Sequence, residues 1–327
     1  MFKVSIKGTG SYLPPRIVPN SYFESRVETT DEWITTRTGI KERRMAAPGQ
    51  PMSDLATPAA EKALEMAGLG PKDLDLIIIG TSTGDMMSPS TGCMVQHKLG
   101  AKNAVAFDIN AACPGFIYGL EVATKFIRDG SRKSVLVVGC EIVSNRIDYE
   151  DRTTCVLFGD GAGAAVLGPA EEGEGRILST HIRSDGDLWE LLYVPGGGSW
   201  HPPSHEMIDN RLQYVKMQGS EVFKYAVRTM VECSIEALNH NRVSPDMVDW
   251  FIPHQANMRI MEAVAKRIGI PLEKVIVTVH KYGNASAATI PTAFDEAVRE
   301  GRIKKGDLVL VCSFGAGFTW GSALIRF

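Results

Sequence analysis

Short apolar runs alternate with amphipathic segments along most of the chain. Leu76–Ile79 and Val135–Val138 each place four apolar residues in a row, and Met1–Gly8 mixes apolar residues with Lys and Ser. Such short runs are typical of β-strands. The segment 116–127 instead spaces its apolar residues as one helical face before Gly130, and therefore predicts a helix. Buried strands that alternate with helices predict a largely parallel sheet covered on both faces.

This pattern occurs twice, at a constant offset of 174 residues. The matched positions are Ala63-Leu64 with Ala237-Leu238, Pro71 with Pro245, Asp75 with Asp249, Ile78 with Ile252, and Val135–Val137 with Val309–Val311. A repeat of this length predicts two copies of one supersecondary unit. We therefore predict an α/β protein whose two duplicated halves, 1–174 and 175–327, form a five-layered α/β/α/β/α sandwich. The linker between them is predicted in the Gly- and Glu-rich segment Gly168–Gly175.

Composition and charge exclude several classes of protein. The 327 residues include 35 Lys and Arg against 38 Asp and Glu, a net charge of -3, which offers no general attraction for nucleic acid or an anionic membrane. No apolar run approaches the ~20 residues of a membrane span, and the amino terminus lacks the apolar core of a secretory signal. The six cysteines form no CxxC pair. We expect a soluble, cytoplasmic protein with reduced thiols.

Cys113 is the first candidate for chemistry. It precedes Pro114, a residue suited to the first position of a helix, so Cys113 is predicted at the N-cap. A helix N-terminus favours the thiolate and would lower the cysteine pKa from ~8.5 towards about 7. The alternative is a buried structural cysteine, the role that we favour for Cys93, Cys140, Cys155 and Cys233.

The repeat brings two further residues to the same site. Adding 174 to Asn110 gives Asn284, so Asn284 is expected in a loop equivalent to the one that carries Cys113. His254 follows the apolar strand 248–253, and ligands of open α/β sheets bind at the carboxyl ends of strands. We expect the remaining histidines to be structural.

Together these residues resemble β-ketoacyl-[acyl-carrier-protein] synthase III, a family of condensing enzymes in the thiolase superfamily. The resemblance covers nearly the whole chain. The matching motifs are Gly39–Arg44, Ala111–Cys113, Phe158–Ala164, His254–Asn257, Gly283–Ser286 and Phe314–Gly321. In isolation Gly159–Gly163 could suggest a nucleotide-binding loop, but the residues that follow read as a strand and supply no helix N-terminus.

The resemblance implies a two-step reaction and its catalytic residues. Cys113 would take the acyl group of an acyl-CoA, with the oxyanion held by the backbone N–H groups of Cys113 and Ala316. Malonyl-[acyl-carrier-protein] would then lose CO2 while neutral His254 and Asn284 stabilise the enolate, which attacks the acyl-Cys113 intermediate. The product would be a 3-oxoacyl carrier protein, the first condensation product of fatty-acid synthesis. The family usually has Gly at position 316, and alanine there requires a compatible φ.

The same resemblance implies binding residues and partners. Trp33, Arg37 and Arg152 would bind CoA, an interpretation that competes with ordinary surface contacts. A docking surface for the acidic carrier protein would comprise Lys224, Arg259, Lys266 and Arg267, which could equally form a solvated charged face. Ser88 would lie in the acyl pocket of the partner subunit of a homodimer. No cofactor or metal is implied, because acyl-CoA and the carrier protein are substrates.

Other functions remain open at the level of sequence. The Cys/His/Asn set also fits a related condensing or acyl-transferring enzyme of secondary metabolism that uses an unusual acyl group. A thiolase would need a second cysteine where this chain has Ser313, and Cys312, one residue away, should point to the opposite face of its strand. A Cys-His-Asn peptidase would lack the repeat, and a binding module has no need of a cysteine at a helix start.

Overall fold

The computed structural model describes all residues, 1–327. The strands are β1 Val4–Tyr12, β2 Arg16–Pro19, β3 Glu42–Met45, β4 Leu76–Gly80, β5 Val105–Ile109, β6 Val135–Ile142, β7 Asp160–Pro169, β8 Arg176–Ser184, β9 Leu192–Tyr193, β10 Lys216–Met217, β11 Trp250–Pro253, β12 Leu308–Gly315 and β13 Thr319–Arg326. The α-helices are α1 Ser21–Glu24, α2 Asp31–Thr38, α3 Ser53–Ala67, α4 Thr91–Leu99, α5 Gly115–Arg128, α6 Arg152–Cys155, α7 His205–Asp209, α8 Gly219–Asn241, α9 Met258–Ile268, α10 Val279–Tyr282 and α11 Thr289–Arg299.

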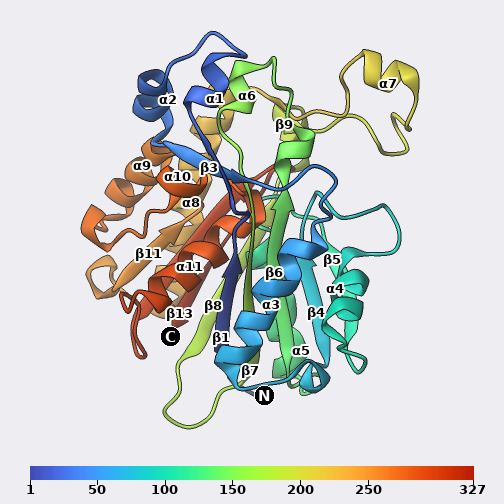
Figure 1. The fold of residues 1–327 in the computed structure, drawn as a ribbon. Coiled ribbons are helices and arrows are strands. Elements are labelled where there is room, and N and C mark those ends of the chain that lie inside the picture. The colour runs from blue at the N-terminus through green and yellow to red at the C-terminus, as the bar shows by residue number, and fades with distance from the viewer.

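Two larger sheets organise these elements (Figure 1). The first has the strand order β1-β7-β6-β4-β5 and the second β11-β12-β13-β8. In the first sheet β4 pairs parallel with β5 and β6, whereas β7 pairs antiparallel with β1 and β6. In the second, β11 and β12 are parallel and the other pairs are antiparallel. The prediction of largely parallel sheets is therefore wrong for half of each sheet. A three-residue turn joins β12 to β13, too short for the crossover that a parallel pair needs.

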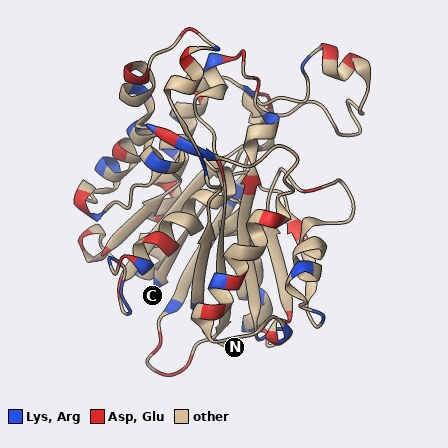
Figure 2. Ribbon diagram, viewed as in Figure 1, with Lys and Arg blue, Asp and Glu red and all other residues tan.

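The helices complete five layers, as predicted. Helices α3 and α4 cover the outer face of the first sheet, and α8 with α9 covers the outer face of the second. Between the sheets lie α5 and α11, each of which packs against strands of both. Figure 1 shows α11 and α5 inside this stack. In Figure 2 most Lys, Arg, Asp and Glu residues lie on the helices and connecting segments, and the long central strands are largely free of charge.

The repeat predicted from sequence is visible in the element boundaries. Helices α5 and α11 begin 174 residues apart, at Gly115 and Thr289, and α3 and α8 end 174 residues apart, at Ala67 and Asn241. The two 3-10 turns that follow α3 and α8, Pro71–Asp73 and Pro245–Met247, keep the same offset. Residues 174 and 175 lie in the connection between β7 and β8, and the division into two domains there stays a prediction.

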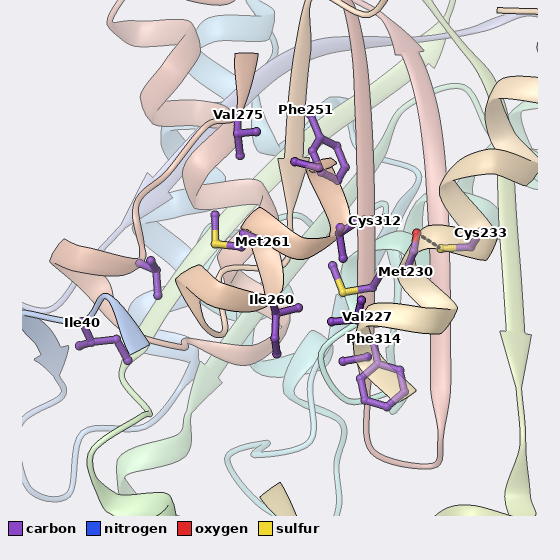
Figure 3. Close-up of a cluster of buried hydrophobic side chains, with 14 of the residues drawn as sticks. Ile40, Val227, Met230, Cys233, Phe251, Ile260, Met261, Val275, Cys312 and Phe314 are labelled. Atoms are coloured by element: carbon purple, nitrogen blue, oxygen red, sulfur yellow. Dashed lines mark hydrogen bonds between the residues drawn. The ribbon is translucent and has the colours of Figure 1, made fainter. Parts of the chain in front are cut away.

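The core on the outer side of the second sheet explains the position of Cys312. Its side chain lies among the apolar residues of α8, α9 and β12, near Met230 and Phe314 (Figure 3). Cys233 of α8 belongs to the same cluster. Cys312 is completely buried there and lines no large cavity, which agrees with the expected orientation. None of the helices combines the length and the apolar character that crossing a bilayer would require.

Each half carries an insertion between its first strand and its first long helix. Residues 13–52 contain β2, α1, α2 and β3, and residues 185–218 contain β9, α7 and β10. Both insertions gather at the end of the molecule where β4, β6 and β11 terminate, and α7 projects away from the layers (Figure 1). The insertions therefore surround the strand ends at which a ligand site is expected.

Candidate active site

Cys113 lies in a tight turn between β5 and α5. Ala112 adopts φ 48°, and its carbonyl accepts the N–H of Gly115 over 2.9 Å. Because this turn delays the helix, α5 begins at Gly115 with Pro114 as its N-cap. The prediction that Cys113 is the N-cap is thus wrong by one residue. Gly315 lies so close that an added Cβ would stand 2.8 Å from the Cys113 nitrogen, which brings the end of β12 against the cysteine.

The electrostatic surroundings of Cys113 differ from the prediction. Burial raises the pKa of the Cys113 thiol to about 12, and the carboxylate of Glu141 adds to this rise. A hydrogen bond with Ser286 acts in the opposite direction but is the weaker influence. The expected low pKa of Cys113 is therefore wrong for the empty site, because desolvation outweighs the start of the helix. The thiol is neutral at rest and needs a proton acceptor when it attacks.

His254 directly follows β11 and is held from two sides. Its backbone N–H donates to the carbonyl of Cys312 over 2.8 Å, and its Nδ1 lies 2.6 Å from the hydroxyl of Thr289. The ring is 4 % exposed. Burial lowers the pKa of His254 to about 3, so the imidazole is neutral, as the resemblance implies.

Asn284 is anchored by main-chain hydrogen bonds to the other half of the chain. Its N–H donates to Leu157 and its carbonyl accepts from Gly159, forming an isolated parallel bridge opposite Phe158. The side-chain Oδ1 accepts the N–H of Ser286 over 2.9 Å. Since the oxygen is occupied, the amide nitrogen is the group available to donate to a ligand.

The three predicted residues meet at one cavity. Cys113, His254 and Asn284 all line a mainly apolar cavity of about 120 Å³. Cys113 also lines a second, larger cavity of about 840 Å³, together with Ala316, Met86 and Met87. Ala316 is absent from the residues with positive φ, so alanine fits its backbone conformation without strain. Cys113 therefore stands between two spaces, one with His254 and Asn284 and one with Ala316.

The predicted CoA-binding residues form a cluster of their own. The guanidinium carbons of Arg37 and Arg152 each lie 4.9 Å from the centre of the Trp33 ring. Neither cavity includes these residues, but Asn257, which lines the smaller one, donates its side-chain amide to the carbonyl of Arg37 over 3.1 Å. The cluster is thus linked to the wall of the site.

The predicted docking residues are exposed on α8 and α9. Lys224 pairs with Glu221 over 2.7 Å, whereas Arg259, Lys266 and Arg267 take part in no salt bridge. The guanidinium of Arg259 lies 5.9 Å from the ring centre of Phe223, a residue of the smaller cavity wall.

Ser88 is exposed and lines neither cavity of its own chain. Because the resemblance assigns it to the pocket of a second subunit, its role stays a prediction.

Sequence reasoning missed three polar residues around the site. Thr289 contacts His254, Ser286 contacts Cys113, and Glu141 contacts Ser286. Ser286 belongs to a motif already recognised, but Glu141 lies inside an apolar strand with no local signal. Among the four cysteines expected to be buried, Cys93 is only partly buried. No group of three or more His, Cys, Asp or Glu side chains is arranged to hold a metal ion.

Comparison with known families matches two parts of the chain. Residues 107–186 match the family described as 3-oxoacyl-[acyl-carrier-protein] synthase III, and residues 238–327 match the C-terminal part of the same family. Similar proteins named β-ketoacyl-[acyl-carrier-protein] synthase III occur in Caldanaerobacter subterraneus and Clostridioides difficile. They are 54% and 52% identical over 98% and 99% of the chain, and 97% and 98% of their own length is covered.

Solved structures lead to the same family. The crystal structure of 3-oxoacyl-[acyl-carrier-protein] synthase III from Aquifex aeolicus is 49% identical, with a TM-score of 0.92 over 99% of this chain and 100% of that one. Identity of this level over full length shows membership as well as a shared fold. The chain belongs to the β-ketoacyl-[acyl-carrier-protein] synthase III family of condensing enzymes.

Proposed function

We propose that the protein condenses an acyl-CoA primer with malonyl-[acyl-carrier-protein], releasing CO2 and giving 3-oxoacyl-[acyl-carrier-protein], the initiating reaction of fatty-acid synthesis. The observation that carries this proposal is the single cavity lined by Cys113, His254 and Asn284. Its relatives at 54% and 52% identity bear the name of this synthase, which favours it over the secondary-metabolism enzyme considered from sequence.

In the first half-reaction Sγ of Cys113 attacks the thioester carbonyl of the primer. The carbonyl oxygen becomes an oxyanion, and the backbone N–H groups of Cys113 and Ala316 are the donors that we assign to it. Both residues line the larger cavity, which supports this pairing. CoA leaves, and the acyl group stays on Cys113 as a thioester.

In the second half-reaction the malonyl thioester binds opposite the acyl-cysteine and loses CO2. Charge develops on the thioester oxygen, and two neutral donors stabilise it, a protonated ring nitrogen of His254 and the side-chain amide of Asn284. The neutral state of His254 and the occupied Oδ1 of Asn284 support these roles. The resulting carbanion attacks the acyl carbon and releases the Cys113 thiolate.

Substrate binding follows from the surfaces around the cavities. We assign Trp33, Arg37 and Arg152 to the CoA nucleotide, because an aromatic ring flanked by two guanidinium groups can bind a base and phosphates. The exposed cations Arg259, Lys266 and Arg267, with Lys224, would bind the acidic carrier protein. A homodimer, a cytoplasmic location and the absence of a cofactor complete the proposal.

Product analysis tests the proposed function. Radiolabelled acyl-CoA is incubated with malonyl-[acyl-carrier-protein] and either wild type or Cys113→Ser, and the carrier-protein products are separated. We expect labelled 3-oxoacyl-[acyl-carrier-protein] and CO2 from wild type alone. Labelled acyl groups on a hydroxyl acceptor without condensation would instead favour the alternative acyltransferase, and the absence of any acyl-enzyme would reject both.

A further inference from the structure

Glu141 is a buried carboxylate without a cationic partner. It stands on β6 with no exposed surface, and no salt bridge in the structure involves it. Its hydrogen-bond donors are neutral hydroxyls and one backbone N–H: Thr81 Oγ1 at 3.2 Å, Ser82 N at 3.1 Å, Ser82 Oγ at 3.0 Å, Thr83 Oγ1 and Ser286 Oγ at 3.1 Å. A buried carboxylate is costly, and one kept without a cation calls for a functional explanation.

Ser286 connects this carboxylate to the nucleophile. Its hydroxyl oxygen lies 3.1 Å from Oε1 of Glu141 and 3.5 Å from Sγ of Cys113. A hydroxyl has one hydrogen to donate, and an ionised carboxylate can only accept. In the resting site Ser286 therefore donates to Glu141, and its lone pair faces the thiol hydrogen of Cys113.

The backbone holds Ser286 in this position. The residue is buried and has φ 48°, in the left-handed region that non-glycine residues rarely adopt. Its N–H is fixed by Oδ1 of Asn284. The hydroxyl is consequently directed between Cys113 and Glu141 by the same loop that presents Asn284 to the cavity.

We propose that Glu141, acting through Ser286, accepts the thiol proton of Cys113 during acylation. This inference rests on the proposed function, because it supplies the proton path for its first half-reaction.

The step balances as a double proton transfer. As Sγ of Cys113 bonds to the thioester carbon, the S–H proton moves to Ser286 Oγ, and the Ser286 hydrogen moves to Oε1 of Glu141. The electron pair of the former S–H bond forms the new C–S bond. When the bond to CoA breaks, the departing thiolate takes a proton back along the same chain. CoA leaves as a thiol, and Glu141 becomes a carboxylate again.

His254 is the other group on the cavity that could accept the proton. Burial lowers the pKa of His254 to about 3, whereas burial raises the pKa of Glu141 above its ordinary value of 4.5. The carboxylate is therefore the stronger base of the two. The Nδ1 of His254 is also taken up by Thr289, and no hydrogen bond joins the ring to Cys113.

The test compares Ser286→Ala and Glu141→Gln with wild type in two assays. The first is the single-turnover rate of acyl-Cys113 formation from acyl-CoA as a function of pH, followed by intact mass. We expect wild type to show a pH-independent region where Glu141 is ionised. Both variants should lose that region, rise about tenfold per pH unit, and be slower by about 10²-fold at pH 7. Decarboxylation of malonyl-[acyl-carrier-protein] should change less than threefold.

The second assay, alkylation of Cys113 by iodoacetamide over the same pH range, needs no acyl substrate. It should show the same loss of the pH-independent region, so it tests the chain even if wild type forms no acyl-enzyme and the proposed function fails. Ser286→Ala keeps the Asn284 contact, which its backbone makes, and guards against misfolding of Glu141→Gln.

Asp160 and Ser144 provide matched controls on the neighbouring strand. Asp160 is also fully buried and accepts a 2.6 Å hydrogen bond from the hydroxyl of Ser144, but neither residue lines the cavities. Asp160→Asn and Ser144→Ala should keep the wild-type pH profiles. The proposal is overturned if Ser286→Ala retains the wild-type profile, or if it slows acylation and decarboxylation by the same factor.

Discussion

The hydroxyl of Thr289 lies 2.6 Å from Nδ1 of His254, on the side of the ring that is packed into the protein. If this hydroxyl donates, the proton of the neutral imidazole resides on Nε2. Thr289 is the first residue of α11, so the orientation of His254 is set by a helix of the central layer. This contact links the chemistry of the second half-reaction to the fold.

The two half-reactions should separate in His254→Ala and Asn284→Ala. Both variants should still form the acyl-enzyme from acyl-CoA. Decarboxylation of malonyl-[acyl-carrier-protein] should fall by about 10²- to 10³-fold, because one donor to the enolate oxygen is lost. CO2 release measures the second step and intact mass the first. His280→Ala, a half-buried histidine outside the cavities, is the control. Wild-type decarboxylation by either variant would remove that residue from the proposed pair.

Replacing the nucleophile should abolish acylation. We expect Cys113→Ser to show no mass gain after addition of acyl-CoA, because a serine hydroxyl is far less acidic than a thiol and a weaker nucleophile here. Cys93→Ser, the other cysteine that is not fully buried, should acylate like wild type. A mass gain that persists in Cys113→Ser would place the nucleophile elsewhere.

Charge reversal on α9 should weaken only the carrier-protein step. For Lys266→Glu we expect a higher KM for malonyl-[acyl-carrier-protein] and an altered dependence on salt, with acylation from acyl-CoA unchanged. Arg259→Glu should act similarly, although its contact with Phe223 gives it a second effect on the cavity wall. Lys305→Glu, exposed in the segment between α11 and β12, is the matched control. Equal KM values for Lys266→Glu and Lys305→Glu would contradict the docking surface.

Primer length should depend on Ser88. The family resemblance places a bulky phenylalanine at this position in acetyl-specific relatives, so serine should leave room for a longer acyl chain in the partner's pocket. Each additional buried methylene contributes about 0.8 kcal/mol, and four would change selectivity by roughly two orders of magnitude. Met86 and Met87, which line the larger cavity, are flexible side chains that oppose this by filling space.

The primer experiment uses acyl-CoA substrates of two to twelve carbons. We expect wild type to accept the longer primers and Ser88→Phe to shift the preference towards acetyl-CoA. A wild type that uses acetyl-CoA alone, with Ser88→Phe behaving identically, would contradict this prediction.

Acid should destabilise the protein through His254. Its pKa is about 3 in the folded protein and about 6.5 when exposed, so below pH 6.5 the unfolded chain binds a proton that the folded one does not. Stability therefore falls as the pH drops from 6.5 towards 3, by about 3 kcal/mol between pH 7 and pH 4 for this group.

Denaturant unfolding of wild type and His254→Gln at several pH values measures the effect. The difference in free energy of unfolding should shrink or reverse in favour of the variant as the pH falls. His205→Gln, exposed on α7, serves as control. Parallel curves for wild type and His254→Gln would show that His254 is not buried in its neutral form.

Much of the fold follows from sequence because the repeat is encoded in local patterns. Pro71 and Pro245 begin equivalent turns, and the apolar strands after them are buried as expected. The direction of β7 and β13 does not follow, since an apolar strand carries no sign of its orientation in a sheet. The catalytic candidates could be predicted because Cys113, His254 and Asn284 each end a recognisable element.

The surroundings of those residues could not be predicted in the same way. The helix start suggested an acidic thiol, yet the pKa of Cys113 is raised by burial that residues from both halves produce. Glu141 lies in the apolar run that forms β6, and only the folded structure shows that Ser286, 145 residues later, reaches it. Desolvation and long-range hydrogen bonds depend on tertiary structure, which local sequence patterns do not encode.

The equal spacing of α5 and α11 has a consequence for how the molecule divides its work. Position 287 corresponds to Cys113 in the repeat, but it is occupied by a buried alanine, while Asn110 and Asn284 occupy the other equivalent pair. An internally symmetric ancestor would have had the same chemical groups on both sides of the central layer. Here the symmetry persists in the backbone and is broken in the side chains. Each chain consequently has one nucleophile, and its second copy of the unit supplies the groups that the nucleophile works with.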